Sequence, residues 1–331
     1  MLRKLVLVPV LAASAALAVA GCGSGSSTTP PATPKPAAPA ADFPAASAVT
    51  LAQLRSKYPE GPILAPSVSI MKPGVKNRFG FALFDKGRNF VNTAAPALYT
   101  AKPDGSGLRG PFPAHIESLK VRPAFLSQTS ATDPQAARQV YVADVRFAGK
   151  GSHVVTGLAR IGGKTLATTP YSIDVGGDPR TQPPGVGDKA IRVHTPTLAS
   201  AGGNAKAIDT RSPPATDLLK TDLYDVLGKK PVVLTFATPQ LCMSRVCGPV
   251  VDVVEQVANE TGSGVAFIHN EIYKDNQISK GVRPQVAAYR LPSEPWTYVI
   301  DRNGIIRTRF EGAFSVGELE RAVAQVNGGK A

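Results

Sequence analysis

Two cysteines in the C-terminal third of the chain have the side chains best suited to chemistry. Cys242 and Cys247 are separated by four residues, and the third cysteine of the sequence, Cys22, lies near the N-terminus. A thiolate is both a nucleophile and a soft metal ligand. The pair therefore points to thiol–disulfide exchange, peroxide reduction, metal binding or a structural disulfide.

The spacing of the two cysteines restricts where they can lie. On one continuous helix, residues i and i+5 would be about 140° apart around the axis and about 7.5 Å apart along it. A disulfide needs Cα atoms within about 7 Å and converging side chains. We therefore expect Cys242 in a turn just before a helix and Cys247 near the first helical turn.

That placement predicts different roles for the two thiols. Backbone N–H groups at a helix N-terminus favour a thiolate. Arg245 lies three residues after Cys242, and no acidic residue occurs between Lys230 and Asp252. We expect Cys242 to be the nucleophile with the lower pKa and Cys247 to be the resolving cysteine.

The elements that position this pair alternate between strand and helix patterns. The apolar run 231–236 predicts a buried central strand, and further strands are expected at 265–269, 296–301 and 305–310. Valines at helical spacing predict a helix that ends near Gly262. Ser315 and Glu318 form a capping box at the start of an amphipathic terminal helix. The order predicts a C-terminal α/β domain over residues 215–331.

Four features of this segment resemble the thioredoxin-like redoxins of extracytoplasmic bacterial lipoproteins, TlpA-like in style. They are the strand that runs into the cysteine loop at 236–242, Tyr289 six residues before Pro295, the strand and turn at 296–304, and the terminal helix. The sequence departs from the family where Leu241 replaces the tryptophan before the first cysteine. It also departs in having a C-x4-C pair in place of C-x-x-C.

The resemblance implies roles for residues around the cysteines. The expected substrate-binding residues are Thr238, Pro239, Arg245, Glu294, Pro295 and Trp296. Thr238 and Pro239 would shape the approach to Cys242, and Arg245 would lie beside it. Pro295 would be cis and would place the Glu294 carbonyl next to the sulfur, where an extended substrate pairs with the backbone. Trp296 would lie near this substrate site or fill the core. No metal and no cofactor are expected.

The segment 60–175 has a different pattern. Phe79, Phe81 and Leu83 alternate with other residues, similar alternation recurs at 140–145 and 154–161, and turn residues separate the runs. Several short strands without a clear helix predict an immunoglobulin-like β-sandwich. His115 and His153 are expected at surface or half-buried positions, and not as ligands.

The N-terminus predicts a lipid anchor. Arg3 and Lys4 precede an apolar stretch too short to span a bilayer comfortably, as in a signal peptide. Residues 19–22, Val-Ala-Gly-Cys, resemble the bacterial lipobox, in which the cysteine is lipidated. Residues 1–21 are thus expected to be removed, and Cys22 is expected to anchor the chain in the bacterial cell membrane from the extracytoplasmic side.

Pro, Ala, Ser and Thr dominate the residues that follow, so we expect 22–59 to form an extended tether. A second Gly- and Pro-rich stretch, 176–214, is predicted to be an interdomain linker that packs on a neighbouring domain, with a weak strand candidate at 190–193. The fold is therefore expected to combine two domains, an N-terminal β-sandwich and a C-terminal thioredoxin-like domain.

The charge of the chain is +13, and +11 remains after Arg3 and Lys4 are removed with the signal peptide. Basic residues are scattered and are not interleaved with aromatics, so no nucleic-acid partner is expected. The expected partners are membrane lipid, through Cys22, and extracytoplasmic protein thiols or disulfides. The sequence leaves the oligomeric state open.

Three alternatives to a thiol–disulfide oxidoreductase remain. A Q-type peroxiredoxin also has two cysteines four residues apart, but its threonine lies three residues before the first cysteine, whereas Thr238 lies four before Cys242. A copper chaperone of the Sco type needs a histidine, and His269 is the substitute available in the domain. In the third alternative, a structural disulfide sits in a non-catalytic, envelope-binding lipoprotein.

Overall fold

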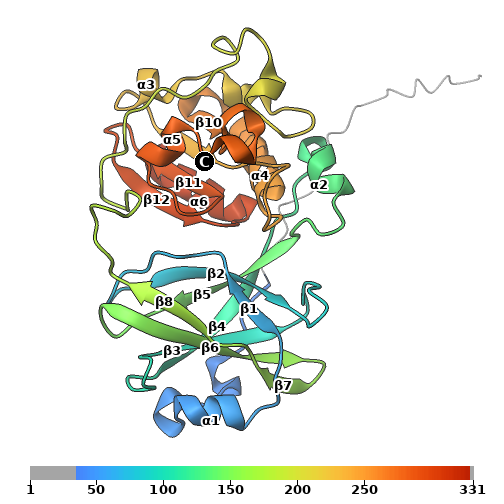
Figure 1. Ribbon diagram of the computed structural model, residues 1–331, viewed down its shortest axis with the longest axis vertical. Coiled ribbons are helices and arrows are strands. Elements are labelled where there is room, and N and C mark those ends of the chain that lie inside the picture. Colours follow the sequence, from blue (N-terminus) through green and yellow to red (C-terminus); the bar gives the residue numbers. More distant parts are fainter. Residues whose placement is uncertain (1–34, 329–331) are drawn as a thin grey trace, which may run out of the picture.

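The computed structural model describes residues 35–328. The predicted signal peptide, the lipidation site Cys22 and the first part of the tether lie outside the described residues. Figure 1 shows two parts stacked along the long axis of the molecule: a curled β-sheet, and a smaller sheet with helices around it. No helix within 35–328 has the length and the apolar character needed to cross a membrane.

The first part is an antiparallel sheet of eight strands. Their bounds are β1 Ile63–Pro66, β2 Asn77–Phe84, β3 Ala95–Ala101, β4 Arg109–Ser118, β5 Gln139–Val145, β6 Gly151–Ile161, β7 Lys164–Ala167 and β8 Tyr171–Val175. The order is β1-β2-β5-β4-β3-β6-β7, and β8 also pairs with β6.

Strand β4 curls this sheet into two layers. Its first half, up to Pro113, pairs with β3, whereas its second half, from Ala114, pairs with β5. The predicted alternation holds in β2, where Phe79, Phe81 and Leu83 are buried in the same core cluster. The β-rich character of this part is therefore confirmed.

Residues 35–59 differ from the expected extended tether because they pack on this sheet. Helix α1 (Leu51–Ser56) begins at Thr50 with a capping box, and Leu54 is buried. Phe43 lies in the same small core as Tyr99 of β3, whose hydroxyl donates a 2.8 Å hydrogen bond to the Pro44 carbonyl. Apolar residues spaced among the prolines offset the entropy cost of ordering this segment.

Residues 176–214 contain no strand, so the weak candidate at 190–193 is wrong. The segment instead runs along the second part of the molecule. The backbone N–H groups of Gly187 and Ala190 donate to the carbonyls of Ile306 and Gly304, at 2.9 Å and 2.8 Å. The Tyr289 hydroxyl donates to the Ile191 carbonyl at 2.9 Å.

The second part is built on a four-stranded sheet with the order β10-β9-β11-β12. Its strands are β9 Val232–Phe236, β10 Ala266–Asn270, β11 Trp296–Ile300 and β12 Ile306–Glu311, and its helices are α3 Leu223–Val226, α4 Cys247–Thr261, α5 Pro284–Ala288 and α6 Val316–Val326. The β9–β10 pair is parallel, and the other two pairs are antiparallel.

Both faces of this sheet are covered, which explains the continuous apolar run in β9. Val232, Leu234 and Phe236 face a core shared with α3 and α5, whereas Val233 faces a core shared with α4 and α6. The predicted ends of two helices are confirmed: Gly262 caps α4 with φ +72°, and the Ser315–Glu318 capping box starts α6.

The two parts are in direct contact. The connection between β4 and β5, which contains the short helix α2 (Gln128–Thr132), packs on α4. Arg78 of β2 donates to both carboxylate oxygens of Glu318, at 2.6 Å and 2.8 Å. Val140 and Val142 of β5 belong to the same buried cluster as Val250 of α4.

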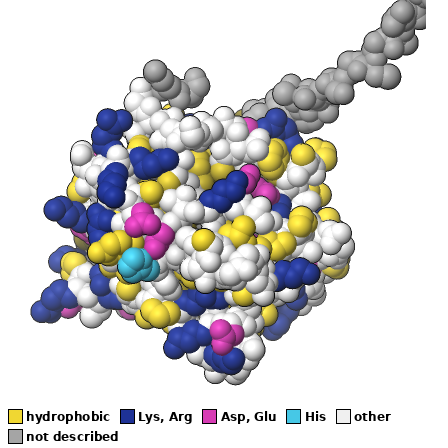
Figure 2. Space-filling view, turned by 90° about the horizontal axis from the view of Figure 1, so that it is seen from above, with side chains coloured by type: hydrophobic (Ala, Val, Ile, Leu, Met, Phe, Trp, Pro, Cys, Tyr) yellow, Lys and Arg dark blue, Asp and Glu magenta, His cyan; other side chains and the backbone are white. Residues whose placement is uncertain are grey.

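Lys and Arg side chains are scattered over the molecule. Figure 2 shows them dispersed over one face, between uncharged and apolar side chains, without a continuous stripe. Several are paired with carboxylates, for example Lys76 with Asp144 at 2.7 Å.

Candidate functional site

The two cysteines lie at the start of α4, one in the loop before the helix and one in its first turn. Cys247 is the first residue of this helix, and Cys242 lies in the turns that connect it to β9. The Arg245 N–H donates to the Cys242 carbonyl at 3.2 Å, and Arg245 has the left-handed φ of +58°. This turn folds the chain back, so the separation expected on a continuous helix does not apply.

Both cysteines are free and buried, and they lie close enough for the Cys247 thiol to lower the pKa of Cys242. Cys242 has an exposed fraction of 4%, and Cys247 has none. The Cys247 thiol donates to the Cys242 sulfur, which lowers the energy of a thiolate at Cys242.

Four donors surround the Cys242 sulfur. They lower its pKa from 9.0 to about 6, with the Cys247 thiol as the largest cause. Burial opposes this shift. The Ser244 hydroxyl, 3.2 Å from the sulfur, and the backbone N–H groups of Cys247 and Val246 lower the pKa further. Cys242 is thus largely a thiolate at neutral pH.

Cys247 has the opposite character. Complete burial raises its pKa well above the ordinary value, and its hydrogen bond to Cys242 and the negative charge there raise it further. The pKa is thus low at Cys242 and high at Cys247. A nucleophilic cysteine needs the first property, and a resolving cysteine that stays protonated until it reacts can have the second.

Arg245 does not take the position expected from its spacing. Its guanidinium points to Asp133 of the β4–β5 connection, with 3.3 Å between Nη1 and Oδ2. Hydrogen bonds from other groups lower the pKa of Cys242. Backbone and side-chain hydrogen bonds stabilise the thiolate in its place. The expectation that Arg245 activates Cys242 is therefore wrong for this structure.

Thr238 and Pro239 are buried at the exit from β9. The Thr238 N–H donates to the Cys247 sulfur, and the Thr238 hydroxyl is buried without a hydrogen-bond partner. The Thr238 carbonyl accepts from the Leu241 N–H at 3.2 Å. Thr238 and Pro239 thus form the start of the loop that leads from β9 to Cys242, and Thr238 lies next to Cys247.

The loop before β11 lies on the other side of the Cys242 sulfur. The Glu294–Pro295 peptide bond is cis, as the resemblance implied. Burial raises the pKa of the Glu294 carboxyl, and the charge of the Cys242 thiolate raises it further. Glu294 is therefore close enough to Cys242 for the two charges to interact.

Trp296 lies away from the cysteines, in the core on the opposite face of the sheet. It is completely buried, and its Nε1–H donates to the Ser293 hydroxyl at 3.1 Å. The Arg309 guanidinium lies 5.2 Å from its ring centroid. Of the two roles considered for Trp296, the structure supports core packing.

A cavity of about 370 Å³ opens beside the cysteine loop. Ser244 and Val246 line it on one side, Glu294 on another, and β1 and β2 close it from the first part of the molecule. Its walls are mostly apolar, but Ser67 Oγ and Glu311 Oε2 in its lining are buried without a hydrogen-bond partner. Burial raises the pKa of Glu311. An apolar pocket with a few unpaired polar atoms is typical of a ligand site.

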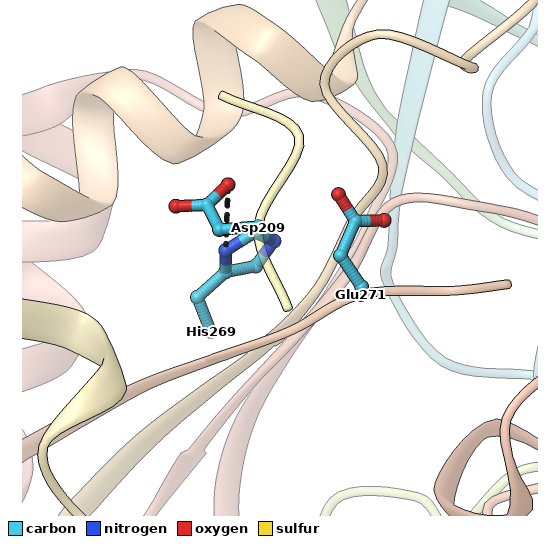
Figure 3. A group of neighbouring side chains, drawn as sticks. All are labelled: Asp209, His269 and Glu271. Atoms are coloured by element: carbon cyan, nitrogen blue, oxygen red, sulfur yellow. Dashed lines mark ion pairs between the residues drawn. The ribbon is translucent and has the colours of Figure 1, made fainter. Parts of the chain in front are cut away.

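Figure 3 shows a second cluster of side chains in this part of the molecule. It consists of Asp209, His269 and Glu271, which are all buried and whose potential donor atoms lie within 4.8 Å of one another. Because the His269 Nε2–H donates to the Ala237 carbonyl at 3.1 Å, the cluster is connected to the residue before Thr238.

The sequence interpretation missed Asp209 and Glu271. His269 and Glu271 are two residues apart at the end of a predicted strand, a spacing that places both side chains on one face of a strand. That spacing was an available signal for Glu271. Asp209 comes from the linker, and no local pattern connects it to His269.

No family model and no curated protein matches the chain. Among solved structures, it is similar to the Lin-41 filamin domain, at 15% identity and a TM-score of 0.17, over 33% of this chain and 81% of that chain. It is also similar to the ZirS C-terminal domain, at 12% identity and a TM-score of 0.17, over 53% of this chain and 87% of that chain. TM-scores this low carry no argument about fold or function.

Proposed function

We propose that this protein is a lipid-anchored, extracytoplasmic thiol–disulfide oxidoreductase with Cys242 as nucleophile and Cys247 as resolving cysteine. The observation that carries the proposal is the pair of sulfurs itself. The Cys242 pKa is lowered to about 6, chiefly by the thiol of a second cysteine that is buried and protonated. A structural disulfide would need neither a stabilised thiolate nor two different pKa values.

The order of elements supports a thioredoxin-like fold for the second part of the molecule. Strand β9 is followed by α4, β10, α5, β11, β12 and α6, the order that we associate with this family. For the first part, we propose an immunoglobulin-like sandwich, supported by the two layers that β4 connects.

The exchange needs no cofactor. The Cys242 thiolate attacks a substrate disulfide, so that a mixed disulfide forms while the substrate S–S bond breaks, and the leaving sulfur takes a proton from solvent. Cys247 then loses its proton and attacks the Cys242 sulfur, which releases the second substrate thiol. The substrate gains two electrons from the cysteine pair, and a dithiol donor in the envelope then reduces the Cys242–Cys247 disulfide by supplying two electrons of its own, becoming a disulfide itself. The reverse sequence oxidises a substrate dithiol.

Features around the nucleophile favour a protein substrate. Met243, next to Cys242, has an exposed fraction of 91% and offers an apolar contact. The cavity beside Ser244 and Glu294 can take an apolar side chain from an extended segment. A cysteine of a partner protein could then reach Cys242 while neighbouring residues occupy the cavity.

The proposed location depends on Cys22 and the signal sequence before it. Two acyl chains on a lipidated cysteine give stable anchoring. Because residues 35–59 pack on the β-sheet, only the residues between Cys22 and Lys35 would separate the membrane from the folded protein.

The test is exchange between the purified protein and a peptide disulfide. We expect Cys242→Ser to abolish exchange and Cys247→Ser to accumulate a mixed disulfide with the peptide. Cys22→Ser is the matched control, which should retain exchange in detergent extracts but lose membrane association in cells. Exchange that persists in Cys242→Ser would refute the proposal. Rapid hydrogen peroxide consumption with a sulfenic acid at Cys242, and no exchange, would favour the peroxiredoxin alternative.

A further inference from the structure

We propose that Asp209, His269 and Glu271 form a binding site for a divalent first-row transition-metal cation, separate from the two cysteines. His269 is in β10, Glu271 follows its last residue, and Asp209 comes from the segment that crosses the end of this strand. Their side chains converge from two elements on one point, as seen in Figure 3.

His269 has one ring nitrogen without a partner. Its Nε2–H donates to the Ala237 carbonyl, so the neutral ring has its lone pair on Nδ1. This Nδ1 is fully buried, has no hydrogen-bond partner and lies 3.6 Å from Asp209 Oδ1. A lone pair that faces a carboxylate oxygen is unfavourable unless a proton or a metal ion lies between them. Burial disfavours the charged ring, but Asp209 raises the pKa of His269, so a bound metal ion would take the place of this proton.

The two carboxylates are held in place by backbone donors. The N–H groups of Arg211 and Ala215 donate to the two oxygens of Asp209, at 2.8 Å and 2.7 Å. The Thr210 N–H donates to Glu271 Oε1 at 2.8 Å. The Thr210 hydroxyl also donates to Glu271 Oε1, at 2.5 Å, and the Ile272 N–H donates to Oε2 at 3.2 Å. Glu271 Oε2 and both Asp209 oxygens therefore each keep a second lone pair that can bind a cation. Hydrogen bonds of this kind, together with the one to Ala237, resemble the outer shell that orients metal ligands.

The charge of the cluster also favours a divalent cation. Two buried carboxylates face a single histidine, and a protonated His269 would leave one negative charge. Arg283 also interacts with Glu271, so negative charge is left uncompensated only when His269 is neutral, which is the state in which Nδ1 can bind a metal ion. Arg211, although adjacent in sequence, pairs with Asp252 at 2.9 Å and with Glu255. A divalent ion would neutralise both carboxylates in a region without access to solvent.

The donor set indicates the kind of ion. One imidazole nitrogen and carboxylate oxygens suit Zn²⁺, Mn²⁺ or Fe²⁺ better than the softer Cu⁺. Ligands at about 2.0–2.1 Å in tetrahedral geometry lie about 3.3 Å from one another. The donor atoms lie within 4.8 Å of one another, so the most distant pair needs to approach by up to about 1.5 Å on binding.

The experiment is a titration of the full-length protein with ZnCl₂ and MnCl₂ in a Cys22→Ser/Cys242→Ser/Cys247→Ser background, which removes all three thiols. We expect one ion per chain, with affinity reduced at least about a hundredfold by His269→Gln or by Glu271→Gln. The matched control is His194→Gln, because His194 also contacts a carboxylate, Asp222, at 2.7 Å but is exposed. This variant should bind as its parent does.

Absence of stoichiometric binding in the cysteine-free background would overturn the proposal, and so would unchanged affinity in a folded His269→Gln protein. If both substitutions prevent folding, zinc-edge X-ray absorption of the wild-type protein decides. Nitrogen and oxygen neighbours without sulfur would support the site, and a sulfur shell alone would refute it. Because the thiols are absent from the titration, failure here is distinguishable from failure of the proposed exchange activity.

Discussion

The backbone N–H of Ala137 donates a 3.0 Å hydrogen bond to the Arg245 carbonyl. Ala137 belongs to the β4–β5 connection of the first part of the molecule, and Arg245 is in the turn between the two cysteines. The Arg245–Asp133 ion pair joins the same two segments. Two contacts with the β4–β5 connection, which belongs to the first part of the molecule, thus stabilise the turn between Cys242 and Cys247.

The reactivity of Cys242 should depend on pH with a midpoint near 6. Its lowered pKa makes the thiolate predominant above about pH 6 and lost below it. The same shift stabilises the folded, reduced protein, and this contribution is complete above pH 9.0 and disappears as the pH falls through about 6. The rate of alkylation by iodoacetamide, measured across this pH range, reports the midpoint.

Cys247→Ala should raise this midpoint, because it removes the largest cause of the shift. Ser244→Ala should raise it less, since the hydroxyl contributes less than the Cys247 thiol. A midpoint that stays near 6 in Cys247→Ala would show that the hydrogen bond between the thiols is not what stabilises the thiolate.

The Cys242–Cys247 disulfide should be more oxidising than that of thioredoxin. A stabilised thiolate favours the reduced form, so we expect a reduction potential between about −270 mV and about −120 mV. Ser244→Ala should make the potential more negative, by about 30 mV for each unit by which the Cys242 pKa rises. Equilibration with glutathione buffers measures both values, and a wild-type potential below that of thioredoxin would contradict the expectation.

Gly312→Ala should destabilise the protein more than Gly281→Ala does. Both glycines have positive φ, +77° and +72°, so the backbone is strained when alanine replaces either of them. A Cβ at Gly312 would also lie 2.5 Å from the Ser67 side chain and 2.8 Å from its carbonyl, whereas a Cβ at Gly281 meets nothing within 4 Å.

Urea unfolding of the two variants gives the comparison. Equal losses of free energy of unfolding would mean that the segment at Ser67 moves away at little cost. A larger loss in Gly312→Ala would show that this contact between the two parts, next to the cavity, is tightly packed.

Asp252→Ala should reduce the free energy of unfolding by about 3 kcal/mol, because it removes the fully buried one of the two carboxylates that pair with the buried Arg211 guanidinium. Asp252 also accepts from the Ser127 hydroxyl at 3.1 Å. Asp217→Ala, which breaks the exposed pair with Lys220, is the control and should cost less than about 1 kcal/mol. Thermal unfolding measures both losses, and similar values would contradict the assigned role of burial.

Local features of the fold could be predicted because their causes lie within a few residues. The alternation in β2, the Gly262 cap and the capping box at Ser315 each depend on neighbouring side chains and backbone groups. The same holds for the position of Cys242 before α4, since the spacing excluded a continuous helix. Misjudged features, such as the packing of residues 35–59, depend on contacts with distant strands.

The amino-acid sequence by itself determined that two thiols lie at the junction of a buried strand and a helix, and that an α/β unit follows a β-rich one. The tertiary structure decided what surrounds those thiols. It turned Arg245 toward Asp133, brought Cys247 into contact with Cys242, and placed Asp209 beside His269, sixty residues away in the chain. Secondary structure follows from short-range patterns, whereas pKa values and ligand sets depend on burial and charge contributed by segments that only folding brings together.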